Sequence, residues 1–198
     1  MDVQLATFKK DIEHYYPGLT DDEWDAIKCK LTSVAFKKEE VVFPGNRLCR
    51  YVLFVSAGIL ASEYQQGSKL IISRFFRKND LCTNVVSFLK EKKCSDQLFT
   101  NTEAHGVLIP RQVFMQYYLH SGGIGLYFRK KILNIVLEDK QFVSIKTISN
   151  TKHQLTFLQE YYPEVLLEVP WKHIANFIGV SAPWLSRILK KKEIRKEL

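Results

Sequence analysis

The sequence of 198 residues predicts an α+β fold, with helices towards both ends of the chain and a roll of short strands between them. Three observations predict it. Apolar residues recur at helical spacing before residue 32 and again after residue 111, and short β-branched and aromatic runs fill the part between. The chain is 46% hydrophobic and 25% charged, which is typical of a folded protein with one sizeable core and a small appendage.

The first element that the sequence predicts clearly is a helix within LTDDEWDAIKCKL. Thr20 is suited to its N-cap, and Glu23 three residues later completes a capping box. Trp24, Ile27 and Leu31 follow at helical spacing. We therefore expect a packing helix here and no binding site.

Short apolar runs separated by turn residues predict six to eight strands between residues 32 and 112. Turns are expected at residues 44–46 and 66–68, and ILASEYQQGSKLIISRF is typical of a hairpin with Gly67 at its tip. Because no helical crossovers separate the runs, we expect a β-sandwich or jelly roll and not a parallel sheet.

A long helix is expected from Ile124 to about Ile148. Its apolar stripe consists of Ile132, Ile135, Val136, Phe142, Val143 and Ile145. A strict heptad repeat does not hold, because Asp139 and Lys146 fall on one candidate seam. The stripe either packs on the chain's own strands or pairs with a second copy, and we favour the second because so long a stripe needs a cover. The predicted domains are 1–118, 119–148 and 149–198.

The stretch HIANFIGVSAPWLSRILKKK, residues 173–192, predicts two short helices joined by a turn. Gly179 is suited to end the first helix, where the chain reverses and φ is expected to be positive. Ser181 is a good N-cap for the second helix. Pro183 fits there because it lies in the first turn, where no N–H is needed.

The same spacing turns Leu185 and Ile188 towards the core and gives the second helix an outward face. The residues that we expect to contact double-stranded DNA are Ser181, Ala182, Trp184, Ser186, Arg187, Lys190 and Lys191. Such a helix fits the major groove, where Arg187 is suited to a bidentate contact with guanine and the lysines neutralise phosphates. Residues 187–198 hold six basic and two acidic residues. Their net charge of +4 is half of the chain's net charge of +8. The alternative is a helical hairpin with a solvated basic end.

Other classes of site find little support. The cysteines are scattered without a C-x-x-C pair, at Cys29, Cys49, Cys82 and Cys94. His105 is the only histidine between residues 32 and 112, so we expect no metal site, no cupin-type enzyme and no catalytic residues. The charged N-terminal sequence is unlike a signal peptide, and no apolar stretch is long enough to span a membrane. These features predict a cytoplasmic protein with reduced cysteines.

Three stretches resemble one family of proteins. YVLFVSAGILASEY, RFFRKNDL and VPWKHIANFIGVSAPWLSRILKK are similar to the hairpin core, the segment before the effector pocket and the helix-turn-helix of the Crp/Fnr bacterial transcription regulators. The third stretch is the most specific, and the resemblance covers nearly the whole chain. The short form is similar to a subgroup common in Bacteroidetes. Only eleven residues follow Arg187, so we expect the usual β-hairpin wing to be absent or truncated.

The resemblance implies a cupin-like β-roll sensor, a long dimerisation helix and a C-terminal DNA-binding domain. It implies a homodimer, joined through the helix around 124–148, whose two recognition helices read a roughly palindromic site with half-sites ~34 Å apart. It also implies an effector in the roll that shifts these helices, and contact with RNA polymerase.

Two departures from the family pattern matter. The glycine–glutamate pair that holds a cyclic nucleotide is replaced by Thr83 and Asn84, and residues 94–96 stand where the phosphate-binding arginine belongs. A buried phosphate without a paired cation is costly, so we do not expect cyclic AMP to bind, although another small effector is possible. The candidate effector-pocket residues are Asp80, Thr83, Asn84, Val85, Ser87, Cys94 and Ser95.

The second departure lies in the recognition helix. Many members of the family carry a polar, often acidic, base-contacting residue where Pro183 stands here. DNA binding therefore carries over through Arg187, whereas the recognised base sequence does not. The alternative function is a ligand-binding β-roll module whose helical tail mediates protein–protein contacts.

Overall fold

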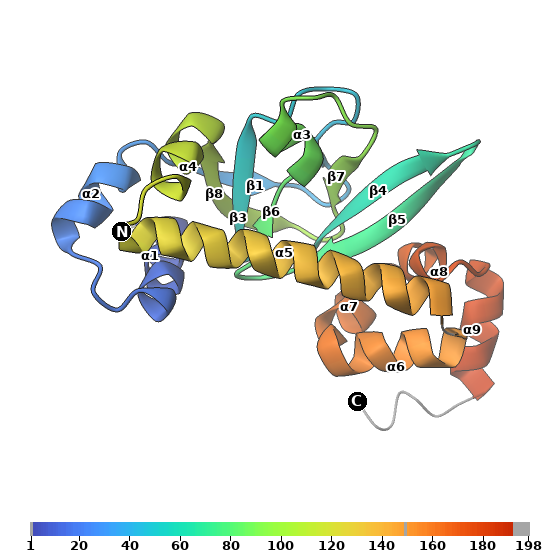
Figure 1. Ribbon diagram of the computed structural model, residues 1–198. Coiled ribbons are helices and arrows are strands. Elements are labelled where there is room, and N and C mark those ends of the chain that lie inside the picture. The colour runs from blue at the N-terminus through green and yellow to red at the C-terminus, as the bar shows by residue number, and fades with distance from the viewer. Residues whose placement is uncertain (1, 149, 192–198) are drawn as a thin grey trace.

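The computed structural model describes residues 2–148 and 150–191, with side chains for all of these except residues 148 and 188–191. Figure 1 shows a β-roll, a long helix that runs along it, and a helical region at the C-terminal side. The described helices are α1 (Val3–Tyr15), α2 (Asp21–Lys28), α3 (Val85–Lys90), α4 (Arg111–Tyr118), α5 (Gly123–Ile148), α6 (Thr151–Tyr161), α7 (Pro163–Glu168), α8 (Trp171–Ile178) and α9 (Ala182–Lys191). The strands are β1 (Thr32–Phe36), β2 (Val41–Phe43), β3 (Tyr51–Ala57), β4 (Leu60–Gln66), β5 (Lys69–Phe76), β6 (Leu81–Cys82), β7 (Gln97–Thr100) and β8 (Ala104–Pro110).

The strands form two antiparallel four-stranded sheets, in the orders β1-β8-β3-β6 and β2-β7-β4-β5. This confirms the predicted β-roll without helical crossovers. The predicted hairpin joins β4 to β5, and Gly67 at its tip has a φ of +61°. Strand β5 lies at the edge of its sheet and therefore has one side without a neighbouring strand.

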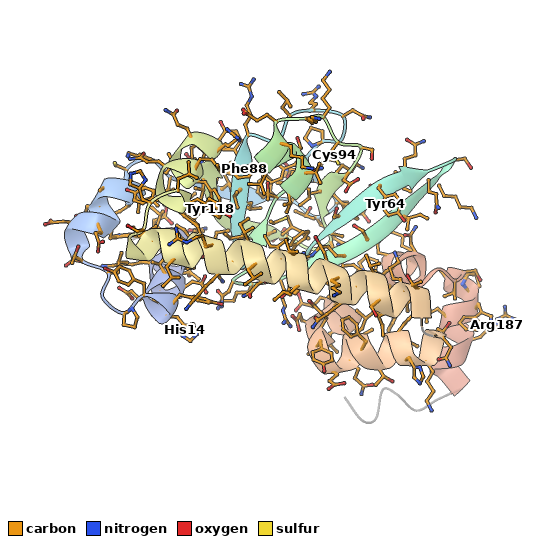
Figure 2. The ribbon with its side chains drawn as sticks, in the orientation of Figure 1. His14, Tyr64, Phe88, Cys94, Tyr118 and Arg187 are labelled. Atoms are coloured by element: carbon orange, nitrogen blue, oxygen red, sulfur yellow. The ribbon has the colours of Figure 1, made fainter. Side chains whose placement is uncertain are left out.

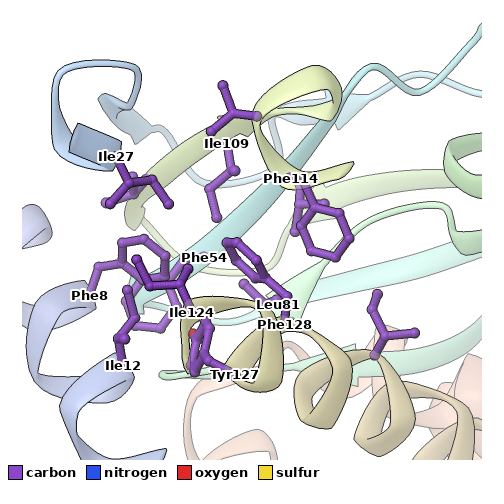
Figure 3. Packing of buried hydrophobic residues seen from close by; sticks show 14 of the residues in the cluster. Phe8, Ile12, Ile27, Phe54, Leu81, Ile109, Phe114, Ile124, Tyr127 and Phe128 are labelled. Carbon is purple, nitrogen blue, oxygen red and sulfur yellow. The ribbon is translucent and has the colours of Figure 1, made fainter. Parts of the chain in front are cut away.

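Helix α2 forms where the sequence predicts a packing helix, although it ends at Lys28 and does not include Leu31. The capping box of α2 is present: the Glu23 amide donates to Thr20 Oγ1 at 3.2 Å, and the Thr20 amide donates to Glu23 Oε2 at 3.0 Å. Trp24 and Ile27 are buried. Figure 3 shows the core that α1 and α2 share with the roll and with the start of α5.

A buried ion pair ties α1 to α5. Lys131 Nζ lies 2.7 Å from Asp11 Oδ2, and each side chain is only 8% exposed. The Tyr127 hydroxyl donates to the same carboxylate oxygen at 2.7 Å, and Lys131 also donates to the carbonyl of Asn79 at 2.6 Å. Burial raises the pKa of Tyr127 well above its ordinary value, so its hydroxyl remains a donor.

The apolar stripe expected on the long helix divides between two faces of α5. Ile132, Ile135 and Phe142 are buried against the chain's own core, whereas Val136 and Val143 are 50% and 64% exposed. The candidate seam that contains Asp139 and Lys146 faces inward: Asp139 accepts from Arg74, and Lys146 donates to the carbonyl of Ile72. Both polar residues therefore have partners within the chain, which explains why the inward seam is not purely apolar.

The outward face of α5 carries a long apolar strip. Its exposed members are Leu126, Leu133, Val136, Leu137 and Val143. Leu126 and Leu133 are one heptad apart, as are Val136 and Val143, so they lie on one side of a helix. We call these five residues the α5 strip.

The C-terminal helices share a core with the roll. Phe177 from α8 contacts Phe75 of β5, with ring centroids 5.2 Å apart, and Phe142 of α5, at 5.6 Å. Tyr162 packs against the same Phe142 at 5.0 Å. The helical region is thus docked on the β4–β5 hairpin and on the second half of α5, as Figure 1 shows. The predicted domain boundaries remain predictions, since the packing continues across them.

Candidate nucleic-acid interface

A sharp turn at Gly179 joins α8 to α9. Gly179 has φ +82° and ψ 27°, which confirms the expected positive φ. Its amide donates to the carbonyl of Ala175 at 2.9 Å, and the Val180 amide donates to the same oxygen at 2.9 Å. A Cβ at Gly179 would meet no atom within 4 Å, so the backbone conformation alone makes glycine the suitable residue.

The second helix starts as the sequence predicts. The Trp184 amide donates to Ser181 Oγ at 3.4 Å, and the Leu185 amide donates to the Ser181 carbonyl at 3.0 Å. Leu185 is fully buried among residues of α8, and Val180 packs against the same cluster. The angle between α8 and α9 is therefore fixed by the packing of Leu185 and Val180 and by the backbone geometry of the turn at Gly179.

The outward face of α9 is solvent-exposed at its first turns. Ser181, Ser186 and Arg187 are exposed, and Trp184 is 37% exposed. Figure 2 shows Arg187 at the outer edge of the helical region. Arg187 Nε donates to the carbonyl of Pro183 at 3.4 Å, so its guanidinium lies back along the helix towards the first turn.

Two residues of the first turn differ from the expectation. Ala182 is half-buried and packs against the α8 cluster, so it lies at the inner edge of the face. Pro183, which was not among the expected contacts, is exposed. The signal was available in the spacing, because Pro183 lies four residues before Arg187 and thus on the same side of a helix.

The remaining predicted contacts fall outside the described side chains. Lys190 and Lys191 belong to the described backbone of α9, but the structure describes neither of their side chains, nor that of Ile188. Lys192 lies outside the described residues altogether. Their expected roles remain predictions.

Helix α8 is attached to the edge of the roll through Asn176. Its Oδ1 accepts from the amide of Ile72 at 2.7 Å, and its Nδ2 donates to the carbonyl of Leu70 at 2.7 Å. The carboxamide thus pairs with edge strand β5 as a neighbouring strand would. Lys146 of α5 satisfies the Ile72 carbonyl at 2.7 Å. Loss of water around its ammonium group lowers the pKa of Lys146 to about 8.

The start of α8 contacts the loops at the same end of the roll. Lys172 Nζ lies 2.9 Å from Glu39 Oε1, and His173 Nδ1 lies 2.6 Å from Asn101 Oδ1. Burial, with a smaller contribution from Lys172, lowers the pKa of His173 below its ordinary value. The lowered pKa favours the neutral imidazole, and its ring packs edge-on against Phe99 with centroids 5.4 Å apart.

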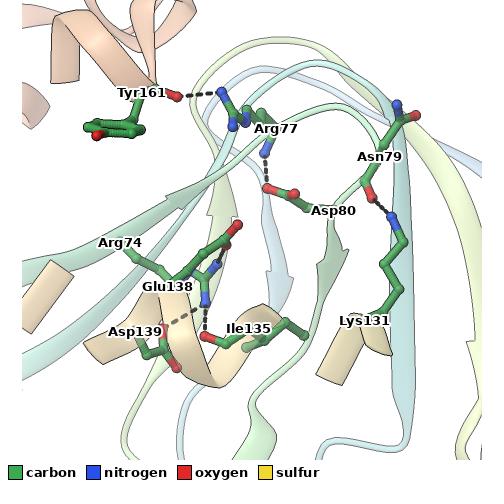
Figure 4. Close-up of polar contacts among 9 residues, drawn as sticks. All are labelled: Arg74, Arg77, Asn79, Asp80, Lys131, Ile135, Glu138, Asp139 and Tyr161. Atoms are coloured by element: carbon green, nitrogen blue, oxygen red, sulfur yellow. Dashed lines mark hydrogen bonds and ion pairs between the residues drawn. The ribbon is translucent and has the colours of Figure 1, made fainter. Parts of the chain in front are cut away.

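Two arginines connect the end of β5 to the helices, as Figure 4 shows. Arg74, which is 3% exposed, donates to the carbonyl of Ile135, to Glu138 and to Asp139 on α5. Arg77 reaches the helical region, where it pairs with Glu164 at 3.1 Å and lies over the ring of Tyr162. The roll, α5 and the helical region are thus held by the buried Arg74 and the half-buried Arg77 as well as by apolar packing.

Most of the candidate effector-pocket residues lie around the start of α3. Thr83 Oγ1 donates to the carbonyl of Tyr51 at 3.0 Å, and Ser87 Oγ accepts from the amide of Cys49 at 2.9 Å. Asn84 is the N-cap of α3: its Oδ1 accepts from the Ser87 amide at 3.0 Å. Their polar atoms are thus used to hold the loop and the helix in place.

The other pocket candidates are dispersed. Val85 is half-buried in the first turn of α3, and Ser95 donates to its neighbour Asp96 at 3.2 Å. The Cys94 carbonyl accepts from Asn46 at 2.7 Å. Asp80 lies before Thr83 in the turn that leads to β6. Burial and the nearby Glu138 raise the pKa of Asp80 to about 6.

Two cavities border this set. One, of about 510 Å³, lies between α3, the start of β3 and α4, and includes Cys49, Ser87 and Arg111 in its lining. The other, of about 270 Å³, lies between α1, α5 and the turn before β6, and Asp80 and Lys131 line it. Each of these two cavities includes one of the predicted residues, Ser87 in the first and Asp80 in the second, and the role of the set in effector binding stays a prediction.

The described residues support neither a metal centre nor a membrane span. No group of three or more His, Cys, Asp or Glu side chains that could hold a metal ion occurs among them. None of the helices within residues 2–148 and 150–191 is long and apolar enough to cross a bilayer.

Comparison with known proteins places the fold. No protein-family model matches the sequence, and no curated protein matches it. Solved structures do match. A protein from Eubacterium rectale, described as a transcriptional regulator of the Crp/Fnr family, is 18% identical with a TM-score of 0.69, and the match covers 92% of this chain and 89% of that one.

Two further structures agree. FixK2 from Bradyrhizobium japonicum is 15% identical with a TM-score of 0.67, over 84% of this chain and 86% of that one. The c-di-GMP-responsive global regulator CLP of Xanthomonas campestris is 14% identical with a TM-score of 0.63, over 82% and 86%. The β-roll, the long helix α5 and the C-terminal helical region therefore give this chain the fold of the Crp/Fnr transcription regulators over most of its length.

Proposed function

We propose that this chain is a DNA-binding transcription regulator that acts as a homodimer and has no enzymatic activity. The observation that carries the proposal is the face of α9, on which Trp184, Ser186 and Arg187 are exposed while Leu185 anchors the helix in the core. A rigid helix with a basic end, in a chain of net charge +8, suits the major groove of a duplex. Binding to the chromosome requires a cytoplasmic location.

The α5 strip supports the dimer. Its five apolar residues are exposed along one side of a helix of 26 residues, and such a surface needs a cover in water. A second copy of α5 provides a cover of the same length and character. Two-fold symmetry then presents two α9 helices to half-sites ~34 Å apart on a roughly palindromic duplex. Contact with RNA polymerase on that duplex is part of the proposal.

The proposed sensor differs from one that binds cyclic AMP. Thr83 and Asn84 already use their side chains to hold β3 and α3, and residues 94–96 supply no cation for a phosphate. Because a phosphate needs a compensating charge when it leaves water, we propose that any effector is another small molecule.

Salt dependence tests the proposed function directly. Duplex binding by the full chain is expected to weaken by ~10³-fold or more between 50 and 200 mM salt, because several phosphates release counterions when they are contacted. Fluorescence anisotropy with a labelled duplex selected from random DNA measures it.

Arg187→Ala is expected to cost about 1–3 kcal/mol of the free energy of duplex binding and to relax the base preference. If neither salt nor this variant changes binding, α9 is not the DNA-contacting helix, and the alternative of a tail that mediates protein contacts is favoured.

A ligand test addresses the sensor. Millimolar cyclic AMP is not expected to change the melting temperature, because no phosphate-binding pair is provided at residues 83–84 and 94–96. Differential scanning fluorimetry of the full chain measures it, with a cyclic-AMP-binding protein as the positive control. A rise of several degrees would contradict the proposed loss of nucleotide binding.

A further inference from the structure

The first turn of α9 presents an apolar surface where base-reading helices approach the bases. Pro183 is exposed, and Trp184 beside it is 37% exposed, although both are apolar for most of their surface. Neither side chain belongs to the core, where Leu185 is fully buried. Ser181 before this turn is polar, but its Oγ already accepts from the Trp184 amide, and the other polar members of the described face, Ser186 and Arg187, lie on the following turn. The leading part of the helix therefore has almost nothing with which to read hydrogen-bonding groups.

The chemistry of DNA narrows what such a surface recognises. Base edges in the major groove offer hydrogen-bond donors and acceptors, together with one apolar group, the 5-methyl of thymine. A proline ring has no donor, and an indole has a single N–H. An apolar first turn therefore gains free energy from a methyl group, because both surfaces lose water on contact.

We propose that Pro183 and Trp184 are specificity-determining residues that contact the methyl group of one thymine in each half-site. The inference rests on the proposed function, since it assumes that α9 enters the major groove. The partner surface is matched in charge as well, because six of the last twelve residues of the chain are basic and the duplex is a polyanion.

The position of Arg187 adds a second base to this site. Its Nε donates to the carbonyl of Pro183 at 3.4 Å, so the guanidinium lies close to the first turn. An arginine aimed into the major groove pairs bidentately with the O6 and N7 of guanine. We therefore expect the half-site to contain a guanine close to the thymine whose methyl group Pro183 and Trp184 contact.

The experiment removes only the methyl group. Duplexes that the full chain retains are selected from random DNA, and each thymine of the selected site is then replaced by deoxyuridine, which keeps every hydrogen-bonding group. We expect one symmetric pair of positions to weaken binding by about fourfold per methyl group, or roughly fifteenfold when both half-sites are changed. All other thymines should tolerate the replacement.

Matched variants assign the effect to the residues. Trp184→Ala should bind the thymine and deoxyuridine duplexes with affinities that differ much less than they do for the unmodified chain. Trp171→Ala is the control, because Trp171 is an equally exposed tryptophan, at 36%, in the same helical region but on α8. It should retain the full methyl dependence, and equal melting temperatures would show that both variants are folded.

The outcomes separate the inference from the proposed function. Salt-dependent binding that is indifferent to deoxyuridine at every position would overturn the thymine contact and leave DNA binding intact. Methyl dependence that survives Trp184→Ala but is lost with Trp171→Ala would place the contact on α8 and would also overturn it. Failure to retain any duplex would overturn the proposed function itself.

Discussion

Replacing Gly179 with valine is expected to weaken duplex binding by about 10²- to 10⁴-fold while the β-roll stays folded. Gly179 has a φ of +82°, which a β-branched residue adopts at a cost of about 1–3 kcal/mol. The turn at Gly179 sets how α9 stands on α8, and a dimer bears the cost twice. Fluorescence anisotropy measures the affinity, and the melting transition of the full chain monitors the roll.

Two milder substitutions at the same position serve as controls. Gly179→Asn should retain most of the affinity, because asparagine tolerates the left-handed region far better than valine does. Gly179→Ala should fall between the two. The space around a Cβ at this position is open, so side-chain size by itself predicts no difference between the variants. Equal affinities for valine and asparagine would show that the conformation of the turn does not control binding.

Lys131→Met is expected to lower the free energy of unfolding by about 3–5 kcal/mol. The substitution leaves Asp11 with its side chain 8% exposed and without the cation that lies 2.7 Å away. The Tyr127 hydroxyl still donates to this carboxylate, but one neutral donor does not replace an ammonium group. Urea-induced unfolding followed by tryptophan fluorescence measures the change.

The double substitution Asp11→Asn with Lys131→Met provides the control. Because it removes both charges, it should recover a large part of the stability lost in the single variant. The asparagine carbonyl can still accept from Tyr127. If Asp11→Asn lowers the free energy of unfolding of Lys131→Met as much as it lowers that of the unmodified chain, Asp11 and Lys131 are not coupled.

The parts of the fold that depend on neighbouring residues follow closely from the sequence. The capping box of Thr20 and Glu23, the hairpin tip at Gly67 and the turn at Gly179 each lie within a few residues of the chain, and all three are found where the sequence predicts them. Burial of Leu185 follows from helical spacing in the same way. The exposure of Pro183 also follows from this spacing, which places Pro183 on the same side of the helix as Arg187.

Contacts between distant residues were not predictable in this way. Asn176 pairs with Ile72 across more than a hundred residues, and nothing near either residue indicates the partner. The long helix shows the same limit. Helical spacing alone groups its apolar stripe into one surface. The hydrogen bond from Arg74 to Asp139 shows which side of the helix faces the chain's own core and which side faces solvent. Side-chain partners on another element decide which apolar residues remain exposed.

The candidate effector pocket illustrates a third case. Alignment with a family pattern groups Thr83, Asn84 and Ser87 as candidate pocket residues, and they do lie together around the start of α3, yet their side chains bond to backbone groups of this chain. A shared fold preserves the position of a loop more readily than it preserves the chemistry of its side chains. The sequence therefore predicts where a sensor site would lie, whereas its ligand depends on atoms that the pattern does not determine.

The carboxamide of Asn176 imitates a peptide unit and covers two backbone groups on the open edge of strand β5. An uncovered strand edge of this kind can pair with a strand of another chain, which promotes aggregation. A movement of α8 away from the roll would expose the β5 backbone groups at Leu70 and Ile72 in the same step. Rearrangement of the C-terminal helices and protection of this strand edge therefore depend on the same amide side chain.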